Sequence, residues 1–203
     1  MSAGRYVAFE GVEGAGKSTT VAMVASRLIE SGEKVVVVRE PGGTPIGEGI
    51  RDVLLHGRDM ADWTEALLFA AQRAQLADEV IAPALAAGSW VLGDRSVYSS
   101  LAYQGGARGL GIERVREVNR AGLGDVWPDM VVLLRLEPGE GLLRERGTDR
   151  IGGQGLEFQQ RVADAYERLV VAEPIRFLSI DATRPADAVV DEVFTALGEW
   201  WLF

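Results

Sequence analysis

Residues 11–18, GVEGAGKS, constrain the fold of this chain more than any other segment. They match the pattern G-x-x-x-x-G-K-[ST], and they lie between a short apolar run at 7–9 and a stretch with helical spacing from 17 onward. In that context the glycines allow consecutive backbone N–H groups to point at a polyphosphate, and the helix start adds its positive dipole end. The motif therefore predicts a strand, a phosphate-binding loop for a nucleoside triphosphate, and a helix.

Two side chains of this loop have predicted chemical roles. Lys17, one of only two lysines in the chain, is expected to reach the β and γ oxygens of ATP, and the Ser18 hydroxyl is expected to ligate Mg²⁺. ATP and Mg²⁺ are thus the predicted cofactors. The predicted nucleotide-binding residues are Gly11, Glu13, Gly14, Ala15, Gly16, Lys17, Ser18 and Thr19.

The rest of the chain alternates short apolar runs with longer helical patterns, which predicts an α/β fold with a parallel sheet buried on both faces. With no internal repeat and no low-complexity linker, residues 1–203 are interpreted as one domain. The predicted strands are 6–9, 35–39, 90–93, 130–136 and 176–180. The predicted helices are 17–31, 46–56, 64–87, 112–121, 157–171 and 185–201. Three glycine-bearing segments, 39–44, 103–111 and 144–155, are expected to be mobile loops over a ligand.

Composition excludes several classes of protein. A net charge of −9 and a pI near 4.8 argue against binding to nucleic acid, which requires a broad basic surface. No apolar run approaches the ~20 residues that a membrane span needs, and the first residues lack the apolar core of a signal peptide. The absence of cysteine fits a reducing compartment and equally fits a compositional bias. We therefore expect a cytoplasmic protein without a membrane or nucleic-acid partner.

A second constellation follows the predicted strand at 90–93. Asp94 and Arg95 come directly after it, so a carboxylate that could bind Mg²⁺ and a guanidinium that could bind phosphate would emerge together at the carboxyl edge of the sheet. Open α/β sheets bind their ligands at this edge. A solvated ion pair at a strand end is the alternative, which the neighbouring phosphate-binding loop makes less attractive.

Taken together, FEGVEGAGKST, REPGGT, DRSVYSSLAYQGG and the arginine-rich segment 144–150 resemble thymidylate kinases over nearly the whole chain. This family transfers the γ-phosphoryl group of ATP to dTMP. The resemblance implies a P-loop nucleoside monophosphate kinase fold, with a five-stranded parallel sheet flanked by helices, and a short lid at about 144–156. It also implies a homodimer, which we expect to form through the helices at 46–56 and 64–87 because the latter is apolar around much of its circumference.

The resemblance further implies roles for acceptor-site residues. Glu13 would bind the 3′-hydroxyl of the deoxyribose, and Phe69 would stack on thymine while Arg73 donates to its O4 carbonyl. Ser100 departs from the longer amide or threonine of many relatives, which weakens the expected base contact. For Phe69 and Tyr103 the alternative is core packing, and for each arginine it is an ordinary surface position. The full set expected around dTMP is Glu13, Arg39, Arg51, Phe69, Arg73, Arg95, Ser99, Ser100, Tyr103 and Gln104.

The charge that moves off the γ-phosphoryl group must be neutralised by some cation. Residues 12–15 contain no arginine, so the phosphate-binding loop does not supply one. The predicted lid contains Arg144, Arg146 and Arg150, and the resemblance implies that the catalytic arginine comes from the lid. We favour Arg146 and Arg150, which join Lys17 and Arg95 as the predicted catalytic residues.

Two other functions remain open from the sequence. Another nucleoside monophosphate or small-molecule kinase, acting on dUMP, dCMP or shikimate, would carry similar phosphate-binding machinery. A nucleotide-dependent switch or binding module is the second, but the chain has no Asn-Lys-x-Asp motif for reading guanine. Three lid arginines would also have no use in a protein that only changes shape.

Overall fold

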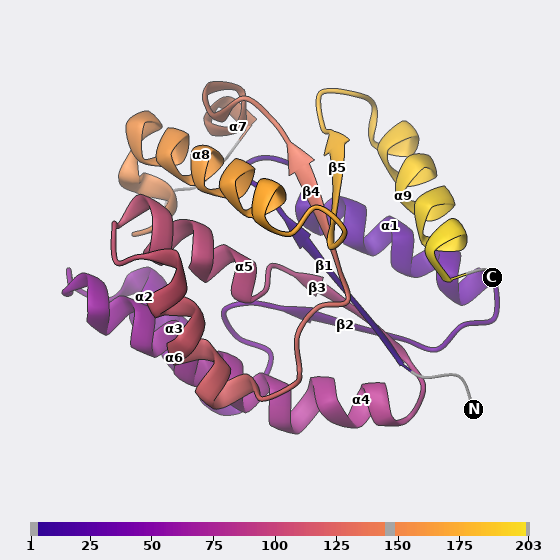
Figure 1. Ribbon diagram of the computed structural model, residues 1–203, viewed down its shortest axis with the longest axis horizontal. Coiled ribbons are helices and arrows are strands. Elements are labelled where there is room, and N and C mark those ends of the chain that lie inside the picture. Colours follow the sequence, from indigo (N-terminus) through magenta and orange to yellow (C-terminus); the bar gives the residue numbers. More distant parts are fainter. Residues whose placement is uncertain (1–3, 145–148, 202–203) are drawn as a thin grey trace.

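The computed structural model describes residues 4–144 and 149–201. Its centre is a parallel sheet of five strands in the order β2-β3-β1-β4-β5, which confirms the predicted architecture (Figure 1). β1 lies in the middle, and residues 6–10 of this strand are buried. The strands are β1 Arg5–Glu10, β2 Val35–Arg39, β3 Trp90–Asp94, β4 Met130–Arg135 and β5 Phe177–Asp181.

Helices cover both faces of the sheet, as expected for strands with near-continuous apolar sequences. α1 and α9 pack on each other and on one face, whereas α3 and α6 and the segments that follow α5 lie on the other (Figure 1). The helices are α1 Lys17–Glu30, α2 Pro45–His56, α3 Asp62–Leu76, α4 Ala82–Ala86, α5 Val97–Ser100, α6 Ile112–Leu123, α7 Pro138–Arg144, α8 Leu156–Ala172 and α9 Ala186–Trp201.

The predicted helix at 64–87 is not regular, because the π-helical segment Ala77–Ile81 separates α3 from α4. The short helices α5 and α7 were not predicted.

The prediction of a mobile loop at 103–111 is wrong for its first half. The π-helical segment Leu101–Ala107 continues α5 and is largely buried. Its glycines serve close packing: a Cβ atom on Gly106 would lie 2.3 Å from the Cβ of Ala165 in α8, and one on Gly105 would lie 2.9 Å from the Cα of Ile112. Glycine here indicates helices in close contact instead of mobility.

The carboxyl ends of the three neighbouring strands β1, β2 and β3 bring polar residues together. In the register of the sheet, Asp94 pairs with Phe9 on one side and with Arg39 on the other. Glu10, Arg39 and Asp94 therefore end their strands at one edge, beside the start of α1. The predicted ligand edge is thus formed by the topology itself.

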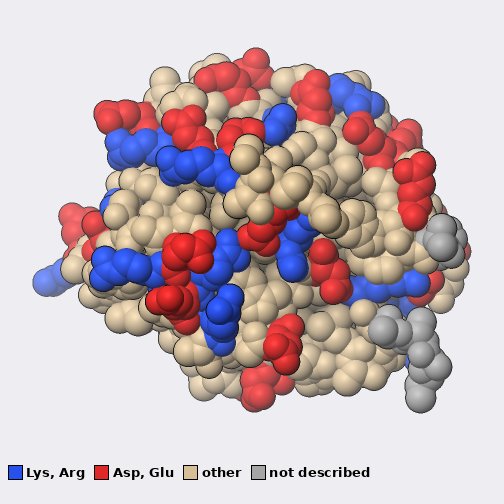
Figure 2. Space-filling model, in the orientation of Figure 1, with Lys and Arg blue, Asp and Glu red and all other residues tan. Residues whose placement is uncertain are grey.

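Charge on the surface is mixed. On the face shown in Figure 2, lysine and arginine side chains lie among aspartate and glutamate side chains instead of covering one broad area. In the part of the chain that the structure describes, no helix combines the length and the apolar character needed to cross a membrane.

Candidate active site

Glycines with positive φ angles shape the phosphate-binding loop between β1 and α1. Gly14 and Gly16 have φ angles of +71° and +86°, a region that L-residues rarely adopt. Gly14 also lies against α7, where a Cβ atom would come within 2.1 Å of the Gly141 carbonyl oxygen. The loop can therefore keep its backbone close to α7 only with glycine at this position.

Lys17 begins α1 and folds back over the loop. Its Nζ donates to the carbonyl oxygens of Gly11 and Val12 at 3.1 and 2.7 Å. Burial, with a smaller contribution from the nearby Arg95 guanidinium, lowers the pKa of Lys17 to about 8. An anionic phosphate at this position would favour the charged form of the lysine, because it adds a partner of opposite charge.

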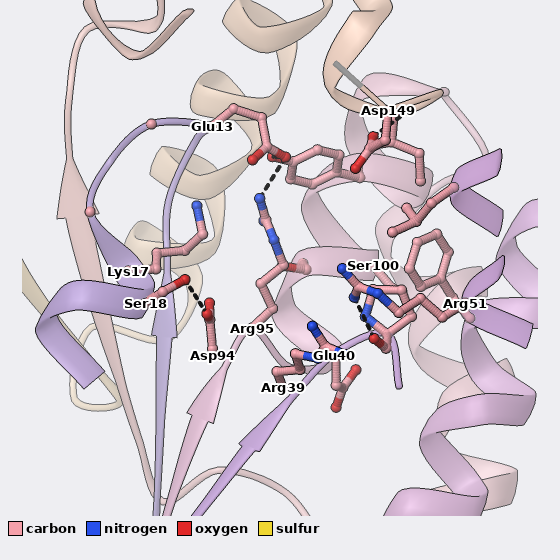
Figure 3. A pocket seen from close by; sticks show the side chains of 18 of the residues that line it. Glu13, Lys17, Ser18, Arg39, Glu40, Arg51, Asp94, Arg95, Ser100 and Asp149 are labelled. Atoms are coloured by element: carbon pink, nitrogen blue, oxygen red, sulfur yellow. Dashed lines mark hydrogen bonds and ion pairs between the residues drawn. The ribbon is translucent and has the colours of Figure 1, made fainter. Parts of the chain in front are cut away.

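Ser18 and Asp94 lie at the same end of the cavity (Figure 3). The Ser18 Oγ donates to the Asp94 Oδ2 at 2.5 Å, so a hydroxyl and a carboxylate converge from α1 and β3. Hard oxygen ligands of this kind suit Mg²⁺, which usually keeps several waters and takes further ligands from phosphate. Among the described residues, no group of three His, Cys, Asp or Glu side chains could hold a metal alone. The pair therefore fits Mg²⁺ that is shared with a bound nucleotide.

A cavity of about 410 Å³ opens beside the loop, and Figure 3 shows side chains from several elements pointing into it. Of the predicted site residues, Glu13, Gly14, Gly16, Lys17, Ser18, Thr19, Arg39, Arg51, Phe69, Asp94, Arg95, Ser99, Ser100, Tyr103 and Gln104 line it. Of the predicted residues that the structure describes, Gly11, Ala15, Arg73 and Arg150 are outside this lining.

Glu13, Arg95 and Tyr103 form one group at the cavity wall. Arg95 Nη2 lies 2.6 Å from Glu13 Oε1, which also accepts from the Tyr103 hydroxyl at 3.1 Å. Burial alone would raise the pKa of Glu13, but Arg95, Lys17 and the Tyr103 hydroxyl outweigh it and hold the pKa below its usual range. The Glu13 carboxylate is therefore an ionised acceptor, and its loop position places it against the cavity.

Arg39 and Arg51 lie at the outer side of the cavity. Arg39 Nη2 is 3.2 Å from both oxygens of Glu48, and both of these side chains are about half exposed. Arg51 Nη1 donates to the Pro41 carbonyl oxygen at 2.6 Å. Both guanidiniums line the cavity and have further N–H groups that could donate hydrogen bonds to a phosphate.

Arg73 is not placed as predicted. Its side chain is 2% exposed; its Nε donates to Glu40 at 2.6 Å, its Nη1 to Asn119, and its Nη2 to the Ser96 carbonyl oxygen. A buried carboxylate requires such a cation, because burial raises the pKa of Glu40 and Arg73 opposes that rise. Each guanidinium nitrogen has a protein partner and the side chain does not line the cavity, so in this structure Arg73 pairs with Glu40 and does not face the ligand space.

The remaining predicted base-site residues divide into two sets. Phe69 is at the cavity surface, and the Ser100 hydroxyl is buried there without a hydrogen-bond partner among the described residues. Ser99 and Gln104 also touch the cavity but direct hydrogen bonds away from it, to Glu10 and Glu65 respectively. Phe69 and Ser100 are consequently better placed to meet a ligand.

The lid arginines also differ in whether they face the cavity. Arg146 lies outside the described residues. Arg150 is directed away from the phosphate-binding loop: its Nη1 pairs with Glu65 at 2.8 Å and its Nε donates to the Leu54 carbonyl oxygen. Arg144, which was not favoured from the sequence, lines the cavity and is 44% exposed. The prediction that Arg150 faces the phosphates is not met in this structure, because buried Glu65 holds it.

Sequence reasoning missed three buried glutamates around the site: Glu10, Glu40 and Glu65. Glu10 ends β1 and Glu40 follows β2, so their positions at strand ends could have signalled them. Glu65 lies on α3 and accepts from Gln104, Arg108 and Arg150, which come from distant parts of the chain. No local pattern in the sequence predicts that convergence.

Comparison with known proteins agrees with this geometry. The sequence profile of the family described as Thymidylate kinase matches residues 9–193. A thymidylate kinase of Deinococcus radiodurans is 45% identical over 203 residues, covering 98% of this chain and 98% of that protein. A thymidylate kinase of Thermomicrobium roseum is 44% identical, covering 96% and 94%, and one of Bacillus pumilus is 42% identical, covering 96% and 95%.

Proposed function

Because the chain belongs to the thymidylate kinase family, and is therefore an ATP-dependent phosphotransferase with the P-loop nucleoside monophosphate kinase fold, we propose that its cavity binds dTMP and ATP together. The product is dTDP, a precursor for dTTP synthesis. The observation that carries the proposal is the composition of one cavity. It joins the phosphate-binding loop to the basic side chains of Arg39, Arg51 and Arg95 and to the aromatic ring of Phe69.

In the proposed reaction the acceptor phosphate attacks the γ-phosphoryl group in line. Lys17 would leave the carbonyl oxygens of the loop and donate to the β and γ oxygens. Arg95 would hold the acceptor phosphate beside them, where repulsion between two phosphates otherwise opposes approach. Positioning and charge neutralisation account for most of the catalysis in phosphoryl transfer.

Ser18 and Asp94 would hold Mg²⁺, which neutralises charge on the nucleotide phosphates when bound. Glu13 would accept a hydrogen bond from the 3′-hydroxyl of the acceptor, and its low pKa favours this role because the carboxylate stays ionised. Phe69 would stack on the base, with Ser100 as an adjacent hydrogen-bonding group. Arg144 is the described lid arginine best placed to reach the transferring group.

We also propose a homodimer through α2 and α3. Ile46, Val53 and Leu67 on these helices expose 56%, 47% and 53% of their surface. Such apolar side chains gain from burial against a second copy. Light scattering at micromolar concentration should then give twice the chain mass of 21.9 kDa, and a monomer would overturn the dimer without affecting the kinase assignment.

An assay of ADP release with dTMP, dUMP, dCMP or no acceptor tests the function. ADP release that depends on dTMP, exceeds the rate with the other acceptors and stops on chelation of Mg²⁺ is the expected result. Equal release with dCMP would favour a broader nucleoside monophosphate kinase. Release that is independent of any acceptor would contradict the proposal.

A further inference from the structure

Glu10, the last residue of β1, is a fully buried carboxylate that the reaction described above does not use. It is 0% exposed and does not line the cavity. Four donors saturate its two oxygens: the hydroxyls of Ser96, Ser99 and Tyr166 at 2.7, 2.6 and 2.7 Å, and the Ser99 backbone N–H at 3.1 Å. A group with so many buried partners has a strictly defined orientation.

The donors join Glu10 to the segment that carries Arg95. Ser96 is the N-cap of α5, and its hydroxyl accepts from the Tyr98 N–H at 3.2 Å while it donates to Glu10. Arg95 precedes this cap with a φ angle of +72°, uncommon for a residue other than glycine. Such a conformation persists only where the surroundings fix it. Glu10 fixes Ser96 and Ser99, which follow Arg95 in the chain.

A second link runs through one hydroxyl. Ser99 Oγ has a single hydrogen, which it donates to Glu10 at 2.6 Å, so its lone pairs face Arg95 Nη1 at 3.2 Å. The Arg95 Nη2 then reaches Glu13 at 2.6 Å. Glu10 thereby sets the direction of the Ser99 hydroxyl, which in turn sets one side of the Arg95 guanidinium.

We propose that Glu10 is a positioning residue for phosphoryl transfer, acting on Arg95 through Ser99. Tyr166 anchors Glu10 from α8, the helix that follows the lid. The inference rests on the proposed function, since that function assigns Arg95 to the acceptor phosphate. It adds a requirement for a buried carboxylate outside the cavity.

The variant Glu10→Gln isolates this requirement. The amide has the shape of the carboxylate, but its Nε2 is a donor and would face groups that donate to Glu10 in the wild-type protein. The Ser99 backbone N–H cannot reverse its role, so Gln Oε1 remains with it and with the Ser96 hydroxyl, and Nε2 faces the hydroxyls of Ser99 and Tyr166. Ser99 Oγ would then accept from Nε2 and direct its hydrogen towards Arg95, where two donors oppose each other. Arg95 should leave its position beside Glu13.

A matched control is Glu173, which also contacts α5. Glu173 accepts from the Tyr98 hydroxyl at 2.7 Å and pairs with Arg116 at 2.7 Å, outside the cavity. Glu173→Gln changes another carboxylate that contacts α5, and kcat should remain within about twofold of the original. Glu10→Gln should lower kcat by about tenfold or more, with the KM for ATP within threefold. An unchanged kcat in Glu10→Gln would overturn the inference.

The double variant Glu10→Gln/Arg95→Ala separates positioning from a general structural effect. If Glu10 acts through Arg95, the double variant has the kcat of Arg95→Ala alone. If the two reductions multiply, Glu10 acts independently and the inference is wrong. Should Glu10→Gln fail to fold, Ser99→Ala removes only the hydroxyl link and should give the same loss of kcat; a normal kcat in that variant would also overturn the inference.

Crystal structures give a readout that does not depend on the reaction. In Glu10→Gln the Arg95 guanidinium should move away from Glu13, whereas in Glu173→Gln it should remain. An unchanged Arg95 in Glu10→Gln would end the inference even if the protein phosphorylates dTMP. Conversely, wild-type protein without dTMP-dependent ADP release would end the proposed function, whatever Arg95 does in the variants.

Discussion

Two arginine–glutamate pairs flank the same loop at 39–44, and they differ in almost every physical property. Arg73 and Glu40, here called the floor pair, lie 2.6 Å apart; Glu40 lines the cavity, Arg73 does not, and each side chain is 2% exposed. Arg39 and Glu48 lie 3.2 Å apart at the rim, with 54% and 46% exposure. A buried pair cannot lose one partner without leaving a desolvated charge, whereas an exposed pair exchanges partners at little loss.

This contrast between floor and rim distinguishes structural from ligand-binding arginines. The floor pair is bound within the protein, because Arg73 does not line the cavity and also donates to Asn119 and to the Ser96 carbonyl oxygen. Arg39 can turn from Glu48 to a phosphate. Arg95 lies between these extremes, with 16% exposure and a partner, Glu13, that is itself in the cavity.

The largest expected effect is at Lys17, whose hydrogen-bond partners are two backbone carbonyl oxygens. Lys17→Ala should lower kcat by roughly 10³-fold, because the variant lacks the ammonium that would neutralise charge on the β and γ oxygens. Steady-state ADP release measures it. Lys34→Ala, at the only other lysine, which is exposed, should leave kcat unchanged. Near-normal turnover of a folded Lys17→Ala protein would remove the loop from the mechanism.

Arg73→Ala breaks the floor pair. The buried Glu40 would lose its cation, and we expect a loss of about 3–5 kcal/mol in the free energy of unfolding. Denaturant unfolding measures the loss, and Arg73→Lys, which keeps the charge, should lose less. A protein of unchanged stability that no longer distinguishes dTMP from dCMP would contradict this expectation. It would show that Arg73 reads the base, as the sequence suggests.

The lid arginines extend the comparison, because Arg144 is exposed at the cavity and Arg150 is held by buried Glu65. Arg144→Ala should lower kcat by up to about 10²-fold if its guanidinium closes on the transferring group. Arg150→Ala should mainly reduce stability, by about 1–3 kcal/mol, since Glu65 keeps Arg108 and Gln104 as partners. Rate measurements and thermal unfolding of both variants check this. If Arg150→Ala instead lowers kcat and Arg144→Ala does not, Arg150 must leave Glu65 during turnover.

The parts of the molecule that sequence predicted well are those that local pattern controls. The five strands and the glycine loop follow from short apolar runs and from the spacing at 11–18, both of which act within a few residues. The site was predictable where it follows strand ends, as at Asp94. The site was not predictable where a buried partner, distant in the sequence, determines the position of a side chain. Nothing near Arg73 or Arg150 in the sequence shows that Glu40 or Glu65 would hold them, because these partners are 33 and 85 residues away.

The smallest expected effect is at the rim, and it tests whether exposed pairs exchange partners. Glu48→Gln removes the charge that competes for Arg39 but leaves an oxygen to accept the Gly43 N–H, now bound at 2.8 Å. Stability should change by less than about 1 kcal/mol, because half-exposed ion pairs contribute little. The KM for dTMP should fall, by no more than about fivefold, since Arg39 no longer has to leave a carboxylate before it binds phosphate. Arg39→Ala is the matched control and should raise that KM. A rise in KM in Glu48→Gln would mean that the glutamate orients Arg39 for the ligand. The exposed Arg39–Glu48 pair would then fix the position of its arginine, as the buried Arg73–Glu40 pair does.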